Sequence, residues 1–245
     1  MTGIKLSLTK VSTLILAGII SFNACADIII SGTRIIYPST AKDVTVNLQN
    51  KGNKPLLVQS WLDDGRDNVN PQQLKLPFII TPPVTRVDAH KGQAIRITWL
   101  GQNMPQDRES LYWLNVLEVP PKAQGAEKQN LLQVAFRTRI KLFFRPNGLK
   151  GSSADAVKNL QWTLNTGAKG SSVTAKNNSP YNVSIASAEL TAGGRTYAID
   201  SHSVKPFSNE TMKIKGTLNA TSGMLKFISI NDFGGSEENK LTLPR

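Results

Sequence analysis

Cysteine is almost absent from this chain, because Cys25 is the only one among its 245 residues. A single cysteine cannot close an intramolecular disulfide, and the Cys/His spacings that hold structural zinc are missing. The fold must therefore be stabilised by a hydrophobic core. A chain of this length is long enough for one large domain or two small ones.

Recognisable catalytic motifs are also missing. The chain has no G-x-S-x-G elbow, no G-x-G-x-x-G and no G-x-x-x-x-G-K-[ST] phosphate loop. Its two histidines, His90 and His202, lie in polar stretches and are interpreted as solvated loop residues. Pairing His202 with Asp200 does not make a triad, because neighbours in sequence do not supply a buried carboxylate that holds the ring. We expect neither catalytic activity nor a cofactor.

Three carboxylates, Asp63, Asp64 and Asp67, lie close together and raise the question of a cation site. A polar turn around Gly65 is the simpler interpretation, because aspartate and glycine are typical turn residues. No metal site is expected.

Long apolar runs are absent except at the N-terminus. Residues 11–22 are apolar, Lys5 and Lys10 precede them, and Ala24-Cys25-Ala26 follows. This pattern predicts a secretory signal peptide over residues 1–26, cleaved after Ala26. The run is too short to span a bilayer, which needs about 20 residues. Lipid anchoring at Cys25 is the alternative, but residues 21–24 fit that motif poorly.

Positive charge is in excess. Removing Lys5 and Lys10 with the signal peptide lowers the net charge from +12 to +10. Such a balance attracts nucleic acid, anionic lipid or an acidic protein. Export argues against nucleic acid, and charge does not choose among the others.

Short strand patterns separated by turn residues fill the rest of the chain. Period-2 alternation at this spacing predicts an all-β fold of two immunoglobulin-like β-sandwiches, residues 27–146 and 147–245. In the first, strands are expected at residues 28–36, 44–49, 56–62, 78–82, 94–99, 111–118 and 132–146. In the second, they are expected at 160–164, 172–177, 181–185, 196–199, 212–215 and 225–230.

The strand at residues 132–146 is more than twice the usual length of roughly 5–6 residues. We expect part of it to project as an unpaired edge that pairs with another chain. Arg137 and Arg139 are interpreted as a solvated basic face. One face is apolar apart from Thr138, and the other is basic: the first carries Leu132, Val134, Phe136, Ile140, Leu142 and Phe144, the second Arg137, Arg139, Lys141 and Arg145.

Further segments occur in a fixed order along the chain. They are Thr33-Arg34, Thr81-Pro82-Pro83, the stretches 105–115 and 140–146, Pro120-Pro121, and Asn231-Asp232-Phe233-Gly234-Gly235. Together with the long strand, this set resembles the periplasmic pilus chaperones of the chaperone–usher pathway. The resemblance covers nearly all of the chain after residue 26. It implies two domains in an L-shaped arrangement with a cleft between them, in the periplasm.

The resemblance also implies a function and partners. Such chaperones bind, fold and cap pilus subunits by lending a strand to an incomplete subunit, and they deliver the subunit to an outer-membrane usher. By position, Leu132, Val134 and Phe136 are the donated residues. The alternative is that these three side chains pack in the core of their own domain. The same strand also offers an edge for self-association of the free protein, and the sequence leaves open whether this occurs.

Charged residues take roles from the resemblance as well. Arg34 and Lys141 match the pair of cations that bind the C-terminal carboxylate of the subunit. Without the resemblance, both are ordinary exposed charges. Glu109, Arg145 and Asp232 match charged residues that link the two domains, and we expect them to fix the interdomain angle.

Two features refine the expectation. The loop at residues 122–130 has nine residues and no cysteine, as in the short-loop class associated with rod-like pili. Phe136 is larger than the aliphatic residue common in the family, so the subunit should have a roomier pocket. A second hypothesis is an exported basic β-sandwich that binds acidic polysaccharide or lipid.

Overall fold

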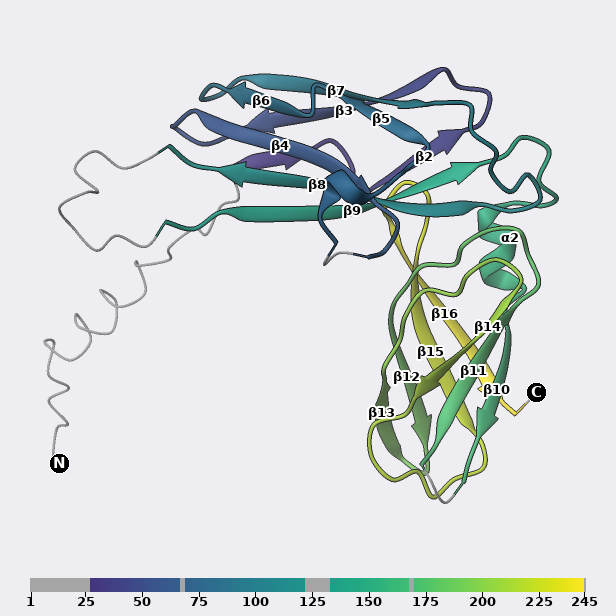
Figure 1. The fold of residues 1–245 in the computed structure, drawn as a ribbon. Helices are drawn as coiled ribbons and strands as arrows, with labels where there is room; N and C mark the ends of the chain where they lie inside the picture. Colours follow the sequence, from purple (N-terminus) through teal and green to yellow (C-terminus); the bar gives the residue numbers. More distant parts are fainter. Residues whose placement is uncertain (1–26, 67–68, 122–132, 168–169, 245) are drawn as a thin grey trace, which may run out of the picture.

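Two β-sandwich domains meet at one end and form the two arms of an L (Figure 1). The computed structural model describes residues 27–244, apart from 67–68, 122–132 and 168–169. The predicted all-β fold and L-shaped arrangement are confirmed. Within the described ranges, no helix is long and apolar enough to cross a bilayer.

The first sandwich is built from a four-stranded sheet, β1-β3-β7-β5, and a five-stranded sheet, β2-β9-β8-β4-β6. In Figure 1, β8 and β9 lie on the side of this sandwich that faces the second domain. A short 3₁₀ helix covers Pro71–Gln73. The strands are β1 (Ile28–Ile30), β2 (Arg34–Pro38), β3 (Asp43–Asn50), β4 (Leu56–Asp63), β5 (Phe78–Thr81), β6 (Val84–Val87), β7 (Gly92–Trp99), β8 (Ser110–Val119) and β9 (Phe136–Arg145).

The single strand expected at residues 28–36 is two strands. β1 pairs antiparallel with β3 in one sheet, and β2 pairs parallel with β9 in the other. The chain changes sheets at Ser31 and Gly32, so the apolar run contributes to both layers. Strand β6, which follows directly on Pro82-Pro83, is not among the expected strands.

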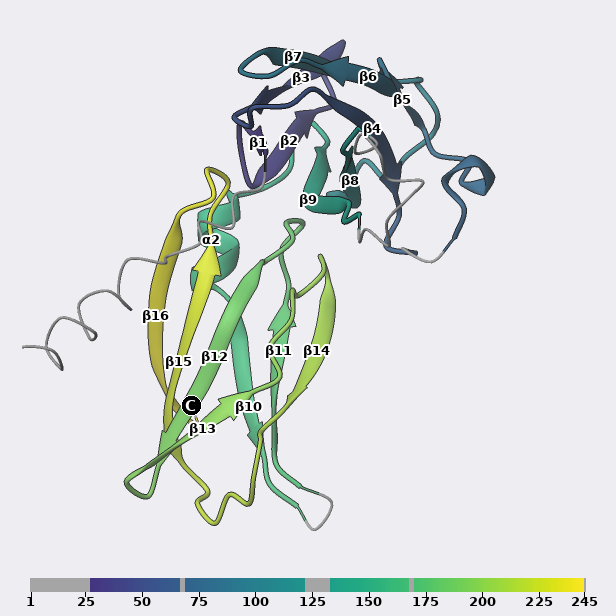
Figure 2. The same cartoon turned by 90° about the vertical axis from the view of Figure 1, so that its left-hand side faces the viewer.

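The second sandwich contains a three-stranded sheet, β10-β11-β14, and a four-stranded sheet, β13-β12-β15-β16. Figure 2 shows the two sheets, with a short helix at the end nearest the first domain. The elements are α2 (Ser153–Lys158), β10 (Gln161–Asn165), β11 (Ser172–Asn177), β12 (Ile185–Ala192), β13 (Arg195–Ile199), β14 (Ser208–Lys213), β15 (Gly223–Ile230) and β16 (Ser236–Leu243).

Three expectations for this domain are wrong. Residues 181–185 do not form a strand, because Val183 makes only an isolated bridge to Val204 and β12 begins at Ile185. The strands β12 and β16 were not predicted. In β16 most side chains are polar and exposed, so the sequence shows little of the alternation that marks a half-buried strand.

The cores follow the period-2 pattern. In β7, Ile95 and Ile97 are fully buried while Arg96 between them is exposed. Burying such a side chain contributes roughly 1.5–3 kcal/mol. Tyr37 in β2 packs against Phe144 in β9, and its hydroxyl accepts a hydrogen bond from the Trp99 backbone nitrogen at 2.9 Å. These contacts fix the ends of β2 and β9 that lie beside the second domain.

Candidate functional site

Strand β9 has an edge that its own domain uses only in part. On one side it pairs with β8 along nearly its whole length, from Phe136 opposite Glu118 to Phe144 opposite Ser110. On the other side it pairs with β2 only from Lys141 onward. In the described part of the chain, residues 136–140 therefore have no strand on that side. Their outward backbone groups are free to pair with an added strand.

The apolar face of the same strand passes from the core into solvent. Ile140 is 8% exposed, whereas Phe136 is 54% exposed and Val134, just before the strand, is 50% exposed. The alternative in which these side chains pack in their own core is wrong for Val134 and Phe136. Leu132 lies outside the described residues. The strand also begins later than expected, at Phe136, because its partner β8 ends at Val119.

Arg34 and Lys141 lie directly opposite one another in the parallel pairing of β2 with β9. Both side chains reach the second domain. The Arg34 Nη1 donates to the Ile230 carbonyl oxygen at 2.9 Å, and the Lys141 Nζ donates to the Ser184 Oγ at 3.1 Å and to the Ser203 Oγ. The structure thus brings the two predicted cations together at the domain junction.

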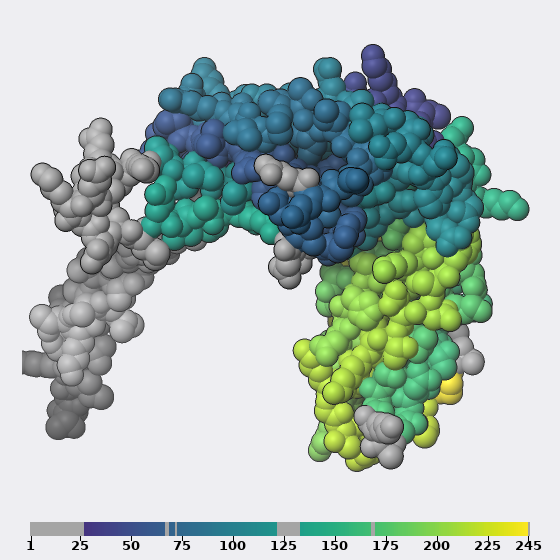
Figure 3. Space-filling view, viewed as in Figure 1, coloured from purple at the N-terminus to yellow at the C-terminus, as the bar shows by residue number. Residues whose placement is uncertain are grey.

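A pocket of about 160 Å³ lies at this junction. Arg34 lines it from the first domain, and Asn182, Ser184 and Ser229 line it from the second. Figure 3 shows the hollow between the two arms of the molecule. Arg34 is therefore placed in a pocket where the domains meet, and Lys141, which does not line this pocket, reaches the same junction through its hydrogen bonds to Ser184 and Ser203.

Neither cation has a carboxylate within ion-pair distance among the described residues. Burial, and to a smaller extent the charge of Arg34, together lower the pKa of Lys141 to about 8. Burial also lowers the pKa of Arg34, which the charge of Asp232 partly opposes. The buried Arg34 Nε has no hydrogen-bond partner in the described ranges. Two adjacent cations with donors to spare form a site that favours an anion.

Arg145, by contrast, is held by two carboxylates. Its Nε donates to the Glu109 Oε1 at 2.7 Å, and its Nη1 donates to the Asp232 Oδ2 at 2.8 Å. The Glu109 Oε2 accepts from the backbone nitrogen of Asn182 at 2.8 Å. Burial opposes the charge on Arg145, but the carboxylates more than offset it and the pKa is raised. The three predicted linking residues thus form one network across the domain junction.

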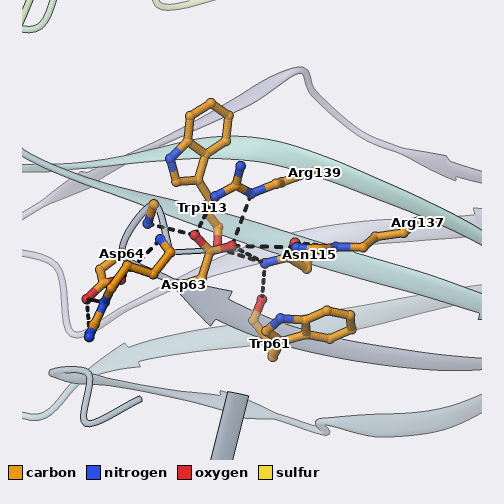
Figure 4. A network of polar contacts seen from close by, with 9 residues as sticks. Trp61, Asp63, Asp64, Trp113, Asn115, Arg137 and Arg139 are labelled. Atoms are coloured by element: carbon orange, nitrogen blue, oxygen red, sulfur yellow. Dashed lines mark hydrogen bonds and ion pairs between the residues drawn. The ribbon is translucent and has the colours of Figure 1, made fainter. Parts of the chain in front are cut away.

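Asp63 is part of another network, which the sequence did not reveal (Figure 4). Its side chain is fully buried, and it also holds the polar turn expected around Gly65, because its Oδ1 accepts a hydrogen bond from the Gly65 backbone nitrogen at 2.7 Å. The Asp63 Oδ2 accepts from the Arg139 Nε at 3.0 Å and from the Asn115 Nδ2 at 2.7 Å. Arg139 also lies over the Trp113 ring, 4.3 Å from its centroid. Its interpretation as a solvated charge is therefore wrong.

Arg137 remains exposed but is held in place. Its Nε donates to the Asn115 Oδ1 at 2.8 Å, and its guanidinium lies 5.2 Å from the centroid of Trp61. Trp61 and Asn115 lie opposite one another in the pairing of β4 with β8. Alternation within each strand is visible in the sequence, but the register that aligns these strands is not.

Both halves of the chain match family models. Residues 27–150 match the N-terminal domain of PapD, a pili and flagellar-assembly chaperone, and residues 155–241 match the C-terminal domain of the pili assembly chaperone PapD. The chain therefore belongs to the PapD family of pilus-assembly chaperones. The resemblance seen in the sequence is confirmed, and the family is one of chaperones rather than enzymes.

Individual relatives agree with this assignment. The chain is 50% identical over 228 residues to the probable fimbrial chaperone YadV of Escherichia coli K12, covering 91% of this chain and 92% of YadV. It is 37% identical over 244 residues to the chaperone HifB of Haemophilus influenzae, covering 98% and 97%.

Solved structures show the same fold. The crystal structure of the YadV chaperone has a TM-score of 0.77 and 49% identity, covering 89% of this chain and all of that one. A chain from the complex of the Salmonella enterica SafA pilin with the SafB chaperone has a TM-score of 0.74 and 30% identity, covering 89% and 97%. These likenesses support a pilus chaperone over a binder of polysaccharide or lipid.

Proposed function

We propose that this chaperone caps a pilus subunit with Leu132, Val134 and Phe136 and holds the C-terminal carboxylate of the subunit between Arg34 and Lys141. The free edge of β9 beside the exposed Val134 and Phe136 carries the proposal. Leu132 is included by position in the family pattern. Capture, folding, capping and delivery to an outer-membrane usher follow from membership of the family.

The geometry also gives the direction of the captured strand. Its carboxylate is bound at Lys141, where β2 begins, and its backbone pairs with residues 136–140. The strand therefore runs toward Lys141, parallel to β9, and ends where β2 starts. Phe136 is five residues from Lys141, about 17 Å along the strand. Burying Val134 and Phe136 in a subunit groove would contribute roughly 1.5–3 kcal/mol for each side chain.

The remaining assignments support this role. Glu109, Arg145 and Asp232 fix the angle between the domains, with the domain boundary at residues 146–147. The chain acts without catalysis or a cofactor, and its short 122–130 loop, outside the described residues, places it with chaperones of rod-like pili. It works in the periplasm after cleavage behind Ala26, which also lies outside the described residues. The free protein self-associates through the same edge.

Co-purification tests the proposal. The chaperone is co-expressed with a tagged fimbrial subunit from its own gene cluster, and Val134→Ser with Phe136→Ser should abolish the complex. The matched control is Ile79→Ser with Val84→Ser, which removes apolar side chains of similar exposure from other strands. An intact complex in the first double variant, or equal loss in both, would contradict strand donation.

A further inference from the structure

The Lys141 ammonium of the first domain is held by two hydroxyls of the second. Ser184, which is 5% exposed, comes just before β12, and Ser203 lies between β13 and β14. Both Oγ atoms accept hydrogen bonds from the Lys141 Nζ. Two separate segments of the second domain therefore converge on one lysine of β9.

The two hydroxyl partners leave one N–H donor and the positive charge of the Lys141 ammonium available to a ligand. An ammonium has three N–H donors and no acceptor. Two of them are donated to the hydroxyls, so one remains. Because the hydroxyls are neutral, the positive charge of Lys141 is not compensated. Burial of an uncompensated charge is unfavourable, in agreement with the lowered pKa of this lysine.

Arg145 provides a contrast on the same strand. It lies four residues further along β9 on the same face, and its partners are the carboxylates Glu109 and Asp232. Internal carboxylates neutralise Arg145, whereas neutral hydroxyls leave Lys141 charged. The groups that surround each side chain thus distinguish Arg145, a structural cation, from Lys141, a cation that can bind a ligand.

We propose that Ser184 and Ser203 are positioning residues of the carboxylate site. As neutral acceptors they hold the Lys141 ammonium in place, direct its third N–H to the incoming carboxylate and supply no competing negative charge. The second domain therefore takes part in recognition of the subunit terminus. This inference rests on the proposed role of Lys141.

Substitutions at Ser203, which is half-buried, test the proposal on the full chain. Ser203→Asp places a permanent counter-charge beside Lys141, and Ser203→Thr keeps the hydroxyl. Ser222→Asp is the charge-matched control, because Ser222 precedes β15 at the end away from the first domain. Among the described residues, Arg34 lowers the pKa of Lys141 and Arg139 lies over the same Trp113 ring, and all three variants leave both cations unchanged.

The probe is sodium acetate, with sodium chloride at equal ionic strength as reference. The readout is the NMR signal of the Lys141 side chain, followed in acetate titrations and across pH. We expect acetate to bind the original chain and the Ser203→Thr and Ser222→Asp variants alike. In Ser203→Asp, acetate affinity should fall about tenfold or more, and the Lys141 pKa should rise toward the ordinary lysine value.

The outcomes distinguish a failure of the proposed carboxylate site from a failure of the proposed role of Ser184 and Ser203. One outcome is that acetate shifts the Lys141 NMR signal of the original chain no more than chloride does. That result would contradict both the carboxylate site and the inference that rests on it. If acetate binds the original chain and Ser203→Asp binds it equally well, the site stands and only the role of the serines is overturned. Loss of binding in Ser203→Thr as well would also overturn it.

A different observation concerns Glu118, which is 3% exposed near the end of β8. Its Oε2 accepts from the Ile28 backbone nitrogen at 3.0 Å, and its buried Oε1 has no partner within hydrogen-bond distance in the described ranges. Burial raises the pKa of Glu118, the Asp27 carboxylate raises it as well, and the nearby backbone N–H groups of Ile28 and Asp27 oppose the shift. An unsatisfied buried polar atom destabilises the folded protein. Asp27 comes directly before Ile28, and its carbonyl accepts from the Lys51 nitrogen at 2.7 Å. The backbone at residue 27 is thus fixed beside this carboxylate.

Cleavage after Ala26 would convert the Asp27 nitrogen into an α-ammonium. We infer that Glu118 binds this ammonium, so that removal of the signal peptide completes the folded first domain. The inference rests on the predicted cleavage position and is independent of the subunit site.

A double-mutant cycle tests this second inference. One chain begins at Asp27 and another carries one extra alanine before it, each with Glu118 or with Glu118→Gln. We expect the Asp27 start to raise the melting temperature by roughly 3–6 °C when Glu118 is present and to have no effect with Glu118→Gln. Equal melting temperatures for the two Glu118 chains, or a difference that persists with Glu118→Gln, would overturn it.

Discussion

Lys141 and Arg145 lie four residues apart on one face of β9, yet only Arg145 has carboxylate partners. Alternation in the strand places both side chains toward the second domain. What distinguishes them is the set of groups that the second domain offers. Glu109 and Asp232 saturate Arg145, while Ser184 and Ser203 leave Lys141 able to bind an anion.

The lowered pKa of Lys141 predicts a pH dependence of subunit binding. A bound carboxylate stabilises the charged ammonium, so binding takes up protons when the pH is near or above about 8. Affinity for the subunit should therefore be constant below pH 7 and fall as the pH rises to 9. Titration calorimetry at pH 7 and pH 9 measures this, and Lys141→Met should bind weakly at both values. An unchanged affinity at pH 9 in the original chain would contradict the assignment.

The same shift predicts how the stability of the free chaperone depends on pH. Between about pH 8 and the ordinary lysine pKa of 10.5, the unfolded chain binds more protons at this residue than the folded chain. The contribution of Lys141 to stability therefore rises with pH across this window. Urea unfolding should show Lys141→Met to be more stable than the original chain at pH 7, by on the order of 1 kcal/mol after allowance for partial exposure. The difference should vanish near pH 10, and a difference that grows with pH would contradict it.

Removing the Asp63 carboxylate should destabilise the first domain. Asp63→Asn leaves Arg139 beside a neutral amide in a buried position, and breaking such a pair costs about 3 kcal/mol. The control is Asp64→Asn, because the Asp64–Arg66 pair lies at the surface and contributes roughly 0–1 kcal/mol. Urea unfolding at pH 7 measures both. Equal stability of the two variants would show that the network does not hold the domain together.

Stability and binding should separate along β9. Phe136 is exposed in the free protein, so Phe136→Ser should change the free energy of unfolding by less than about 0.5 kcal/mol while lowering the yield of subunit complex. Ile140 is buried, and Ile140→Ala should cost about 2–5 kcal/mol. Chemical unfolding and co-purification measure the two effects. A large loss of stability in Phe136→Ser would mean that its side chain serves its own core.

Arg145 should control the relation between the domains. Arg145→Ala leaves Glu109 and Asp232 without their shared cation. Contacts such as the Asn182–Glu109 hydrogen bond and the packing of Arg108 over Phe207 remain. Small-angle scattering should show a broader range of interdomain arrangements than in the original chain. Arg86→Ala, which removes a surface charge paired with Asp88, is the control and should leave the scattering unchanged. An identical profile for Arg145→Ala would refute this role.

Much of the first domain could be predicted from local pattern. The alternation through Ile140, Leu142 and Phe144 predicted β9, because those side chains are buried on one face and the cations lie on the other. The same reasoning failed for β16, where Glu237, Glu238 and Lys240 give no apolar alternation although the backbone is fully paired with β15. A strand at the edge of a sheet can be held by its neighbour without a strong pattern of its own.

The polar networks were harder to predict. Arg139 meets Asp63 across two intervening pairings, from β9 to β8 and from β8 to β4. Such contacts depend on the register of both pairings, which joins residues 24 apart in sequence (Asn115 and Arg139) and 50 apart (Asp63 and Trp113). The chain shows which residues share a face, but not which of them lie side by side. The role of Ser184 and Ser203 was missed for the same reason, since serines in polar loops carry no distinctive signal.

The position at which β2 begins has a consequence for every client of this chaperone. Because β2 already occupies the rest of the β9 edge, an incoming strand cannot slide past Arg34. If the subunit carboxylate is bound between Arg34 and Lys141 as proposed, each side chain of the subunit strand is positioned by its distance in sequence from the last residue. One extra residue at the client terminus would turn all of its inward side chains outward. Clients that differ widely in sequence therefore need to share only the spacing of their final residues.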